Sequence, residues 1–244
     1  MNFCLYDGGG PHALTCFRGM AFNCVLVTKY YPGWECLIFY DSTVPKQVLD
    51  ELTRLGAKLH DCTDLNWPGA KLMAARFLTM DPEMGYEYSL SRDADSRITP
   101  REVEAVERWI AKKEFPFMSM HDSISHNIYM MGGMISWRPC VRNIRAMIDS
   151  YFKAVTWTPA YGWDQEFLSM YIEPRAIAYT EFVGCHWSRF KEDDAIDFKI
   201  PVAPGDYHVG ACHPPSDGQL EKAGVDVGIF KRLAESRLGP DTAY

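Results

Sequence analysis

The sequence predicts an α/β domain in which a mixed, mostly parallel sheet carries helices on both faces. Short apolar runs alternate with helix-like stretches along residues 1–113, as strands and their crossover helices do. The composition, with 47% hydrophobic and 23% charged residues, is that of a globular protein with a substantial core. The 244 residues contain no internal repeat, low-complexity tract or obvious linker, which favours a single domain.

Four strands are predicted in the first half, with a helix-like segment between each pair. The strands are residues 3–7, 35–41, 57–62 and 86–93, and the helix-like segments are 15–30, 44–56 and 74–80. A glycine-rich turn, "GGGPH", follows the first strand. The segment 44–56 is the clearest helix, because Gly56 can end it and one face is apolar; that face contains Val48, Leu49, Leu52 and Leu55.

A further helix has a well-marked start directly after the fourth strand. Thr99 is the predicted N-cap, Pro100 occupies the first helical position, and Glu102 completes a capping box. The predicted buried face of this helix contains Val103, Val106, Trp109 and Ile110. The loop between the strand and this helix contains Asp93 and Asp95, so both lie at the carboxyl end of a strand, where open α/β sheets bind ligands.

The remaining segments are less regular and rich in aromatic residues and methionine. We expect strands at residues 117–120, 133–136 and 176–182, and helices at 139–151 and 163–171. Residues 201–244 contain many prolines and no long periodic run, so we expect a C-terminal tail that lies over the domain.

The net charge and the cysteine content limit which partners the protein is expected to bind and in which cellular compartment it is expected to lie. The formal net charge of -7 opposes non-specific binding to a phosphate backbone, which makes nucleic acid an unfavoured partner. The 8 cysteines form no Cys-x-x-Cys pair, and the sequence has neither an export signal nor an apolar stretch long enough to span a membrane. We therefore expect reduced thiols in a cytoplasmic protein.

Asp93 and Asp95 form an Asp-x-Asp pair that can hold one hard divalent cation, such as Mg²⁺ or Mn²⁺. A cation bound by so few carboxylates completes its coordination with substrate phosphates, so a nucleoside diphosphate is the natural partner. Arg92 and Arg97 flank the pair and can neutralise phosphate or hold the carboxylates. The competing interpretation is a helix-start cluster stabilised by the helix dipole.

Several segments in order resemble a small family of viral and bacterial nucleotide-sugar glycosyltransferases with the GT-A fold. They are "KYYPGWECLIFYDSTVP", "ARFLTMDP", "RDADSRITPREVEAVERWI", "MHDSISHNIYMMGGM" and "YGWDQEFL", and they span about residues 20–170. The resemblance implies transfer of a sugar from a nucleoside-diphosphate donor, with Mn²⁺ or Mg²⁺ joining the diphosphate to Asp93 and Asp95. It also suggests a virus-encoded enzyme in the host cytoplasm, and a single GT-A-like domain with a nucleotide-binding half (1–113), an acceptor-side half (114–200) and the tail (201–244).

The same resemblance assigns roles to residues outside the Asp pair. The donor-binding set comprises Asp7, Gly8, Arg76, Arg92, Asp93, Ala94, Asp95, Gly132 and Gly133. The catalytic candidates are Asp164 and Gln165, which match an Asp-Gln-x-x-Leu pattern of retaining enzymes, and Asp122 as a second carboxylate. A C-terminal histidine is a common third metal ligand, and the candidates are His186, His208 and His213; water is the alternative.

Each of these roles has a structural alternative. Asp164 also fits a helix N-cap, Arg76 a surface ion pair, and the glycine pairs simple turns. The Asp-Gln pair favours a retaining transferase. The expected donor is a UDP-sugar, and the expected acceptor is a glycan or another hydroxyl group. Two other functions stay open: a nucleotidyltransferase-type sugar activator, although "YDGGGPHALTCFRG" lacks that class's lysine, and a catalytically inactive nucleotide-sugar or glycan-binding protein.

Overall fold

The computed structural model describes residues 1–156, 161–184, 195–202, 204 and 207–238. A parallel three-stranded sheet has the order β1 (Asn2–Leu5), β2 (Leu37–Tyr40), β3 (Lys58–Asp61). A second sheet has the order β4 (Ser89–Leu90), β6 (Ile135–Trp137), β5 (Phe117–Met120), β7 (Thr180–Val183), β8 (Ala195–Ile196). Only β6 runs antiparallel to its neighbours, so the predicted mixed, mostly parallel sheet is confirmed.

The two sheets meet where β1 lies beside the end of β4. A parallel bridge links Asn2 with Ser91, and the amide of Arg92 donates to the carbonyl oxygen of Asn2 over 3.0 Å. The bridge joins the first residue of β1 to the residue after β4, so the loop that follows β4 continues alongside β1 toward the carboxyl end of β1. This juxtaposition places the loops that follow these two strands at one edge of the sheet.

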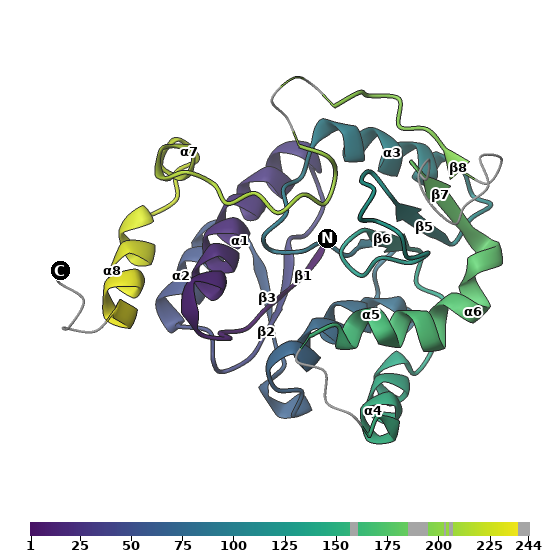
Figure 1. Ribbon diagram of the computed structural model, residues 1–244, viewed down its shortest axis with the longest axis horizontal. Helices are drawn as coiled ribbons and strands as arrows, with labels where there is room; N and C mark the ends of the chain where they lie inside the picture. Colours follow the sequence, from purple (N-terminus) through teal and green to yellow (C-terminus); the bar gives the residue numbers. More distant parts are fainter. Residues whose placement is uncertain (157–160, 185–194, 203, 205–206, 239–244) are drawn as a thin grey trace.

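Helices cover both faces, as expected (Figure 1). Alternating side chains of the strands enter two different cores: Phe3 and Ile38 pack with α1 (Gly10–Tyr30), α2 (Lys46–Arg54) and α3 (Pro100–Ala111). Cys4 and Phe39 pack with a long 3₁₀ helix (Gly69–Met80), α4 (Ile144–Ala154) and α5 (Trp163–Phe167). The period-two alternation of strand side chains thus divides the apolar residues between the two faces.

Several elements differ in detail from their predictions. The segment 74–80 belongs to the 3₁₀ helix, and the strand expected at 86–93 is only two residues long in β4. α5 continues as a π-helical segment, Leu168–Ile172, into α6 (Glu173–Ala176). Thr99 caps α3 by accepting from the Glu102 amide, but the Glu102 side chain pairs with an arginine instead of returning to the cap, so the full capping box was wrong.

The predicted C-terminal tail was wrong for residues 217–238. They form α7 (Asp217–Lys222) and α8 (Val227–Leu238), and α8 packs against α1. Val227, Phe230 and Leu233 are buried in the core on the α1 side of the sheet. Their three-residue spacing is typical of a helix, but it extends over few residues, and the many prolines of this region favoured an irregular tail. Within the described residues, every helix is too short or too polar to cross a lipid bilayer.

Candidate functional site

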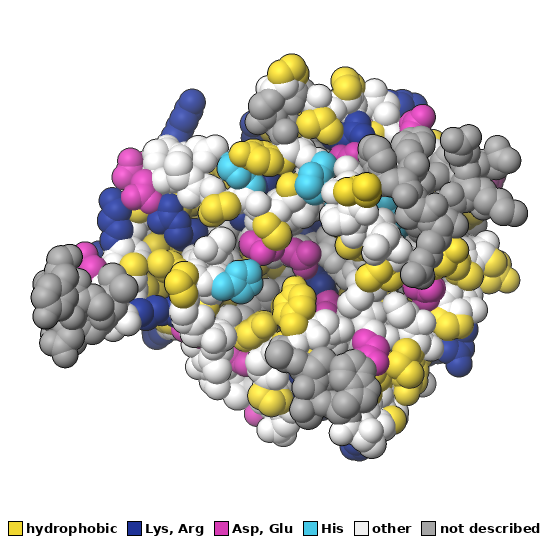
Figure 2. Space-filling view, viewed as in Figure 1, with side chains coloured by type: hydrophobic (Ala, Val, Ile, Leu, Met, Phe, Trp, Pro, Cys, Tyr) yellow, Lys and Arg dark blue, Asp and Glu magenta, His cyan; other side chains and the backbone are white. Residues whose placement is uncertain are grey.

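A pocket of about 230 Å³ opens at the carboxyl end of β1, beside the loop that follows β4. The loop after β1, the first turns of α1 and the loop after β4 form most of its wall. Its lining residues are Cys4, Leu5, Tyr6, Gly8, Gly9, His12, Ala13, Cys16, Met73, Asp93, Ala94, Asp95 and Tyr161. In Figure 2, acidic and histidine side chains gather near the centre of this face, bordered by hydrophobic side chains.

Arg76 links two carboxylates at the base of this region. Its Nη1 lies 2.5 Å from Asp93 Oδ1, and its Nη2 pairs with Asp164. The arginine is only 2% exposed, whereas a third of the Asp93 side chain is exposed. Burial by itself lowers the pKa of Arg76, but the nearby Asp164 and Asp93 carboxylates hold that pKa above its ordinary value. Arg76 therefore stays a cation that joins the two carboxyl groups in one partly buried network.

The segment that contains Gly132 and Gly133 packs directly on this network. A Cβ built on Gly133 would lie 2.0 Å from Asp93 Oδ2, and one on Gly132 would lie 2.8 Å from Asp164 Oδ2. Gln165 holds the segment, since its Nε2 donates to the Met130 carbonyl over 2.6 Å and its Oε1 accepts from the Gly132 amide over 2.9 Å. Both glycines are thus explained by close approach to charged side chains.

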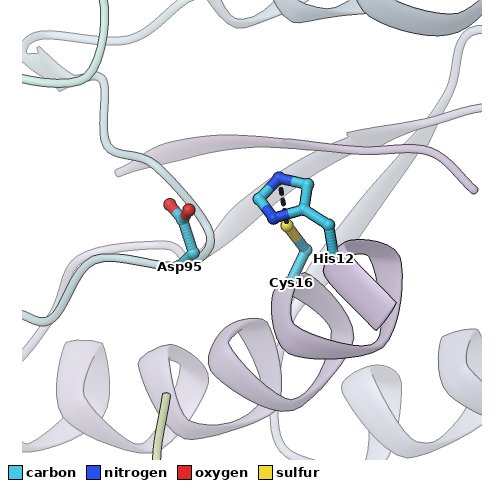
Figure 3. A group of neighbouring side chains, drawn as sticks. All are labelled: His12, Cys16 and Asp95. Carbon is cyan, nitrogen blue, oxygen red and sulfur yellow. Dashed lines mark hydrogen bonds between the residues drawn. The ribbon is translucent and has the colours of Figure 1, made fainter. Parts of the chain in front are cut away.

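Whereas Asp93 contacts Arg76, Asp95 lies beside the first turns of α1 (Figure 3). His12 and Cys16 extend from the first turns of α1, with 3.6 Å between His12 Nε2 and Cys16 Sγ. The ligand atoms of His12, Cys16 and Asp95 all lie within 4.8 Å of one another. Cys212 donates its thiol to Asp95 Oδ2 over 3.2 Å. Burial, reinforced by Asp95, raises the pKa of both thiols to about 12.

The sequence prediction missed His12 and Cys16. They are four residues apart, which puts them on one helical face. The predicted helix began at Thr15, so His12 was assigned to the glycine-rich turn; α1 in fact begins at Gly10. No local sequence pattern predicts that Cys212 lies beside Asp95, because the two residues are far apart in the sequence.

Arg97 and α1 hold the Asp95 loop in place. The Arg97 guanidinium donates to the Gly19 carbonyl over 2.9 Å and, through Nε, to the His213 carbonyl over 2.8 Å. Asn23 donates to the carbonyl oxygens of Ala94 and Ser96 over 3.3 and 3.0 Å. The loop is therefore anchored by its backbone, which leaves the carboxylates of the Asp pair facing the pocket.

Five predicted donor-binding residues are not part of the pocket wall: Asp7, Arg76, Arg92, Gly132 and Gly133. Arg76 and the two glycines lie beside Asp93 and Asp164, whereas Arg92 and Asp7 make contacts elsewhere. Arg92 is 2% exposed and donates through Nε to Glu102 over 2.9 Å, so it serves as a buried ion pair beneath α3. Asp7 pairs with Arg237 of α8 and accepts from the Gly9 amide over 2.9 Å. Both side chains contact other groups of the protein, and their roles beside a phosphate and a nucleoside stay predictions.

The predicted second carboxylate, Asp122, is also engaged elsewhere. Both of its oxygens accept from Arg101, at 2.9 and 2.7 Å, and it accepts from the Val209 amide over 2.9 Å. This arrangement ties the C-terminal segment to the start of α3. A carboxylate held by two guanidinium bonds is poorly suited to act as a base.

The histidines proposed as third metal ligands do not join the Asp pair. The His208 ring lies 5.3 Å from the His126 ring, and the His213 ring stacks on Tyr207 at 3.9 Å. His213 contacts Asp95 only through its amide, which donates to the Asp95 carbonyl oxygen over 3.0 Å. His186 lies outside the described residues.

The pocket has an acidic excess that suits a cation. The region contains three carboxylates and two guanidinium groups, those of Asp93, Asp95, Asp164, Arg76 and Arg97. Among the described residues, no arginine or lysine nitrogen lies within 4.0 Å of the Asp95 carboxylate. Asp93 and Asp95 both line the pocket, and carboxylate oxygens are the ligands that hard divalent cations prefer. Beside Asp95, the imidazole and thiol groups add softer ligands.

Comparisons with known proteins do not identify a family. No protein-family model matches the chain, and no curated protein is significantly similar to it in sequence. Among solved structures, a cytidylyltransferase from Leptospira borgpetersenii serovar Hardjo-bovis aligns over 100% of this chain and 96% of its own, with 9% identity and a TM-score of 0.41. The resemblance to glycosyltransferases therefore stays a prediction.

Proposed function

We propose that the protein is a metal-dependent glycosyltransferase that moves a sugar from a nucleoside-diphosphate donor to a hydroxyl acceptor. The observation that carries the proposal is the convergence of Asp93 and Asp95, from the loop after β4, with the glycine-rich loop on one pocket at the carboxyl end of β1. A UDP-sugar is the favoured donor and a glycan the favoured acceptor, both on the sequence resemblance alone.

Each wall of the pocket has a role in this proposal. Asp93 and Asp95 would hold Mn²⁺ or Mg²⁺, which supplies charge stabilisation for the departing diphosphate. The backbone of Gly8 and Gly9 would approach the nucleoside, because it has no Cβ there and Gly9 has φ of 76°. Ligand sites usually measure about 300–1,000 Å³, so a nucleotide sugar would extend from this smaller pocket into solvent.

Arg76 would act mainly by fixing Asp93 and Asp164 in place. Arg76 is buried, and its two terminal nitrogens already donate to Asp93 and Asp164. Little of its guanidinium is therefore left to contact a substrate. Asp164 is 5% exposed, so its proposed contact with the donor sugar depends on its exposed edge, and Gln165 holds the Gly132 segment beside it. We keep retention of configuration as the favoured outcome for the transfer, on the sequence resemblance.

The test is calorimetric titration of UDP-, GDP- and dTDP-sugars, with Mn²⁺ and with EDTA. The variant is Asp93→Asn, which removes one metal ligand while leaving Arg76 paired with Asp164. The matched control is Asp50→Asn, an exposed aspartate on α2 that pairs with Lys46. We expect one nucleotide class to bind only with Mn²⁺, and Asp93→Asn but not the control to lose that binding.

Turnover separates the competing functions. Release of nucleoside diphosphate from the bound donor supports a transferase, and analysis of the product anomer distinguishes retention from inversion. Release of pyrophosphate from a nucleoside triphosphate and a sugar phosphate would instead identify a sugar activator. Donor binding without any turnover would identify a binding protein. If no donor binds in the presence of Mn²⁺, the proposal is wrong.

A further inference from the structure

We infer that His12, Cys16, Asp95 and Cys212 form a binding site for a thiophilic divalent cation of the Zn²⁺ class at the mouth of the pocket. The site is distinct from the proposed Asp93–Asp95 cation site, although it shares Asp95. It does not rest on the proposed transfer activity, because it follows from the ligand groups alone.

The four groups come from three segments that the fold brings together. His12 and Cys16 occupy successive turns of α1, Asp95 lies on the loop after β4, and Cys212 precedes α7. Figure 3 shows the side chains of His12, Cys16 and Asp95 directed into the same space. The Ser96–Cys212 bridge and the His213 amide bond to Asp95 hold the C-terminal segment against this loop.

The spacing of the ligand atoms is close to that of a tetrahedral zinc site. Bonds of about 2.0–2.3 Å to zinc place neighbouring ligand atoms of a tetrahedron about 3.3–3.8 Å apart. The His12 Nε2 to Cys16 Sγ distance is 3.6 Å, and the Cys212 Sγ to Asp95 Oδ2 distance is 3.2 Å. The separations among His12, Cys16 and Asp95 reach at most 4.8 Å, so these three ligand atoms need shifts of only about 1 Å to surround a cation. Cys212 joins the group through its contact with Asp95.

The chemistry of the set selects the cation. Two thiols and an imidazole are ligands that Zn²⁺ prefers, whereas Mg²⁺ and Mn²⁺ prefer oxygen. Each cysteine gives up its thiol proton to solvent when the cation binds. A hydrogen bond along α1 explains the approach of His12 to Cys16, but it does not explain why a carboxylate lies beside this pair or why a second thiol bonds to that carboxylate.

Cobalt titration of the chelator-treated, reduced protein tests the site. We expect Co²⁺ to produce a sulfur-to-metal charge-transfer band, and Zn²⁺ to abolish the band by displacement. Cys16→Ser should remove most of the band, and His12→Ala should weaken Zn²⁺ binding at least tenfold, because residues that merely orient ligands already contribute about 10–100-fold. Cys140→Ser, at an exposed thiol far from the site in sequence, is the control.

The outcomes separate this site from the transferase proposal. A charge-transfer band that Cys16→Ser keeps, or that Cys140→Ser loses equally, would overturn the site, as would the absence of any band in the wild type. Circular dichroism melting shows whether each variant still folds. Because Asp93→Asn leaves all four ligands intact, it should lose donor binding while keeping the cobalt band, so either proposal can fail without the other.

Discussion

Replacing Gly19 by alanine sets two opposite expectations against each other. Gly19 lies inside α1, where alanine is ordinarily about 0.5–1 kcal/mol more favourable than glycine. A Cβ at this position would, however, lie 2.3 Å from the Ala94 carbonyl oxygen and 2.3 Å from Arg97 Nη2. The Ala94 oxygen belongs to the backbone of the Asp93–Asp95 loop, so it can move only if that loop moves.

The close contact is expected to outweigh the helical preference. Forcing an extra carbon into a packed site costs about 1–3 kcal/mol, and the displaced Ala94 oxygen also loses its bond from Asn23. We expect a net destabilisation of about 1–3 kcal/mol, which lowers the melting temperature by roughly 2–12 °C for a chain of this size. The displaced loop should also weaken Mn²⁺-dependent donor binding, because Ala94 separates the two aspartates.

Gly218→Ala provides the matched control. Gly218 is also helical, in α7, but a Cβ there has no atom within 4 Å. Its melting temperature should be unchanged or slightly raised. Thermal and urea denaturation of the two variants measure the difference. A Gly19→Ala protein as stable as the wild type, beside a normally behaving Gly218→Ala, would refute the close packing of α1 on the Asp loop.

Three further predictions concern the core and its charges. Glu102→Gln leaves the Arg92 guanidinium buried without its carboxylate, and urea denaturation should report a loss of about 3–5 kcal/mol; a loss below 1 kcal/mol would show that the pair is not buried in solution. Phe230→Ala should lower the free energy of unfolding by about 3–5 kcal/mol, because this ring is 1% exposed within the core. An unchanged stability would show that α8 does not pack in the core. Burial, aided by His208, lowers the pKa of His126 to about 4, below the ordinary 6.5 of an unfolded chain. Between pH 6.5 and pH 4 the unfolded state binds more protons than the folded state, so this contribution to the free energy of unfolding is fully present above pH 6.5 and about 3 kcal/mol of it is lost as the pH falls to 4. Urea denaturation of His126→Asn across the same pH range should show a smaller loss. An identical loss would contradict this assignment.

Local patterns predicted most of the fold. The Thr99–Pro100 start of α3 and the apolar stripe of α2 are encoded within a few residues, so both helices appear near their expected places. The strands β1 and β2 were predicted for the same reason. The 3₁₀ character of the Gly69–Met80 segment and the shortness of β4 depend on packing between distant segments, which periodicity does not report.

The sequence by itself determined that Asp93 and Asp95 follow a strand and precede a helix, because strand, loop and cap are contiguous in the chain. Only the tertiary structure decided which charges meet them. It buries Arg92 beneath α3, sets Arg76 behind Asp93, and brings Cys212 to Asp95. These contacts depend on how the sheet edge, α1 and the C-terminal segment pack together. No local pattern encodes that packing, because the contacting side chains are neighbours only after the chain has folded.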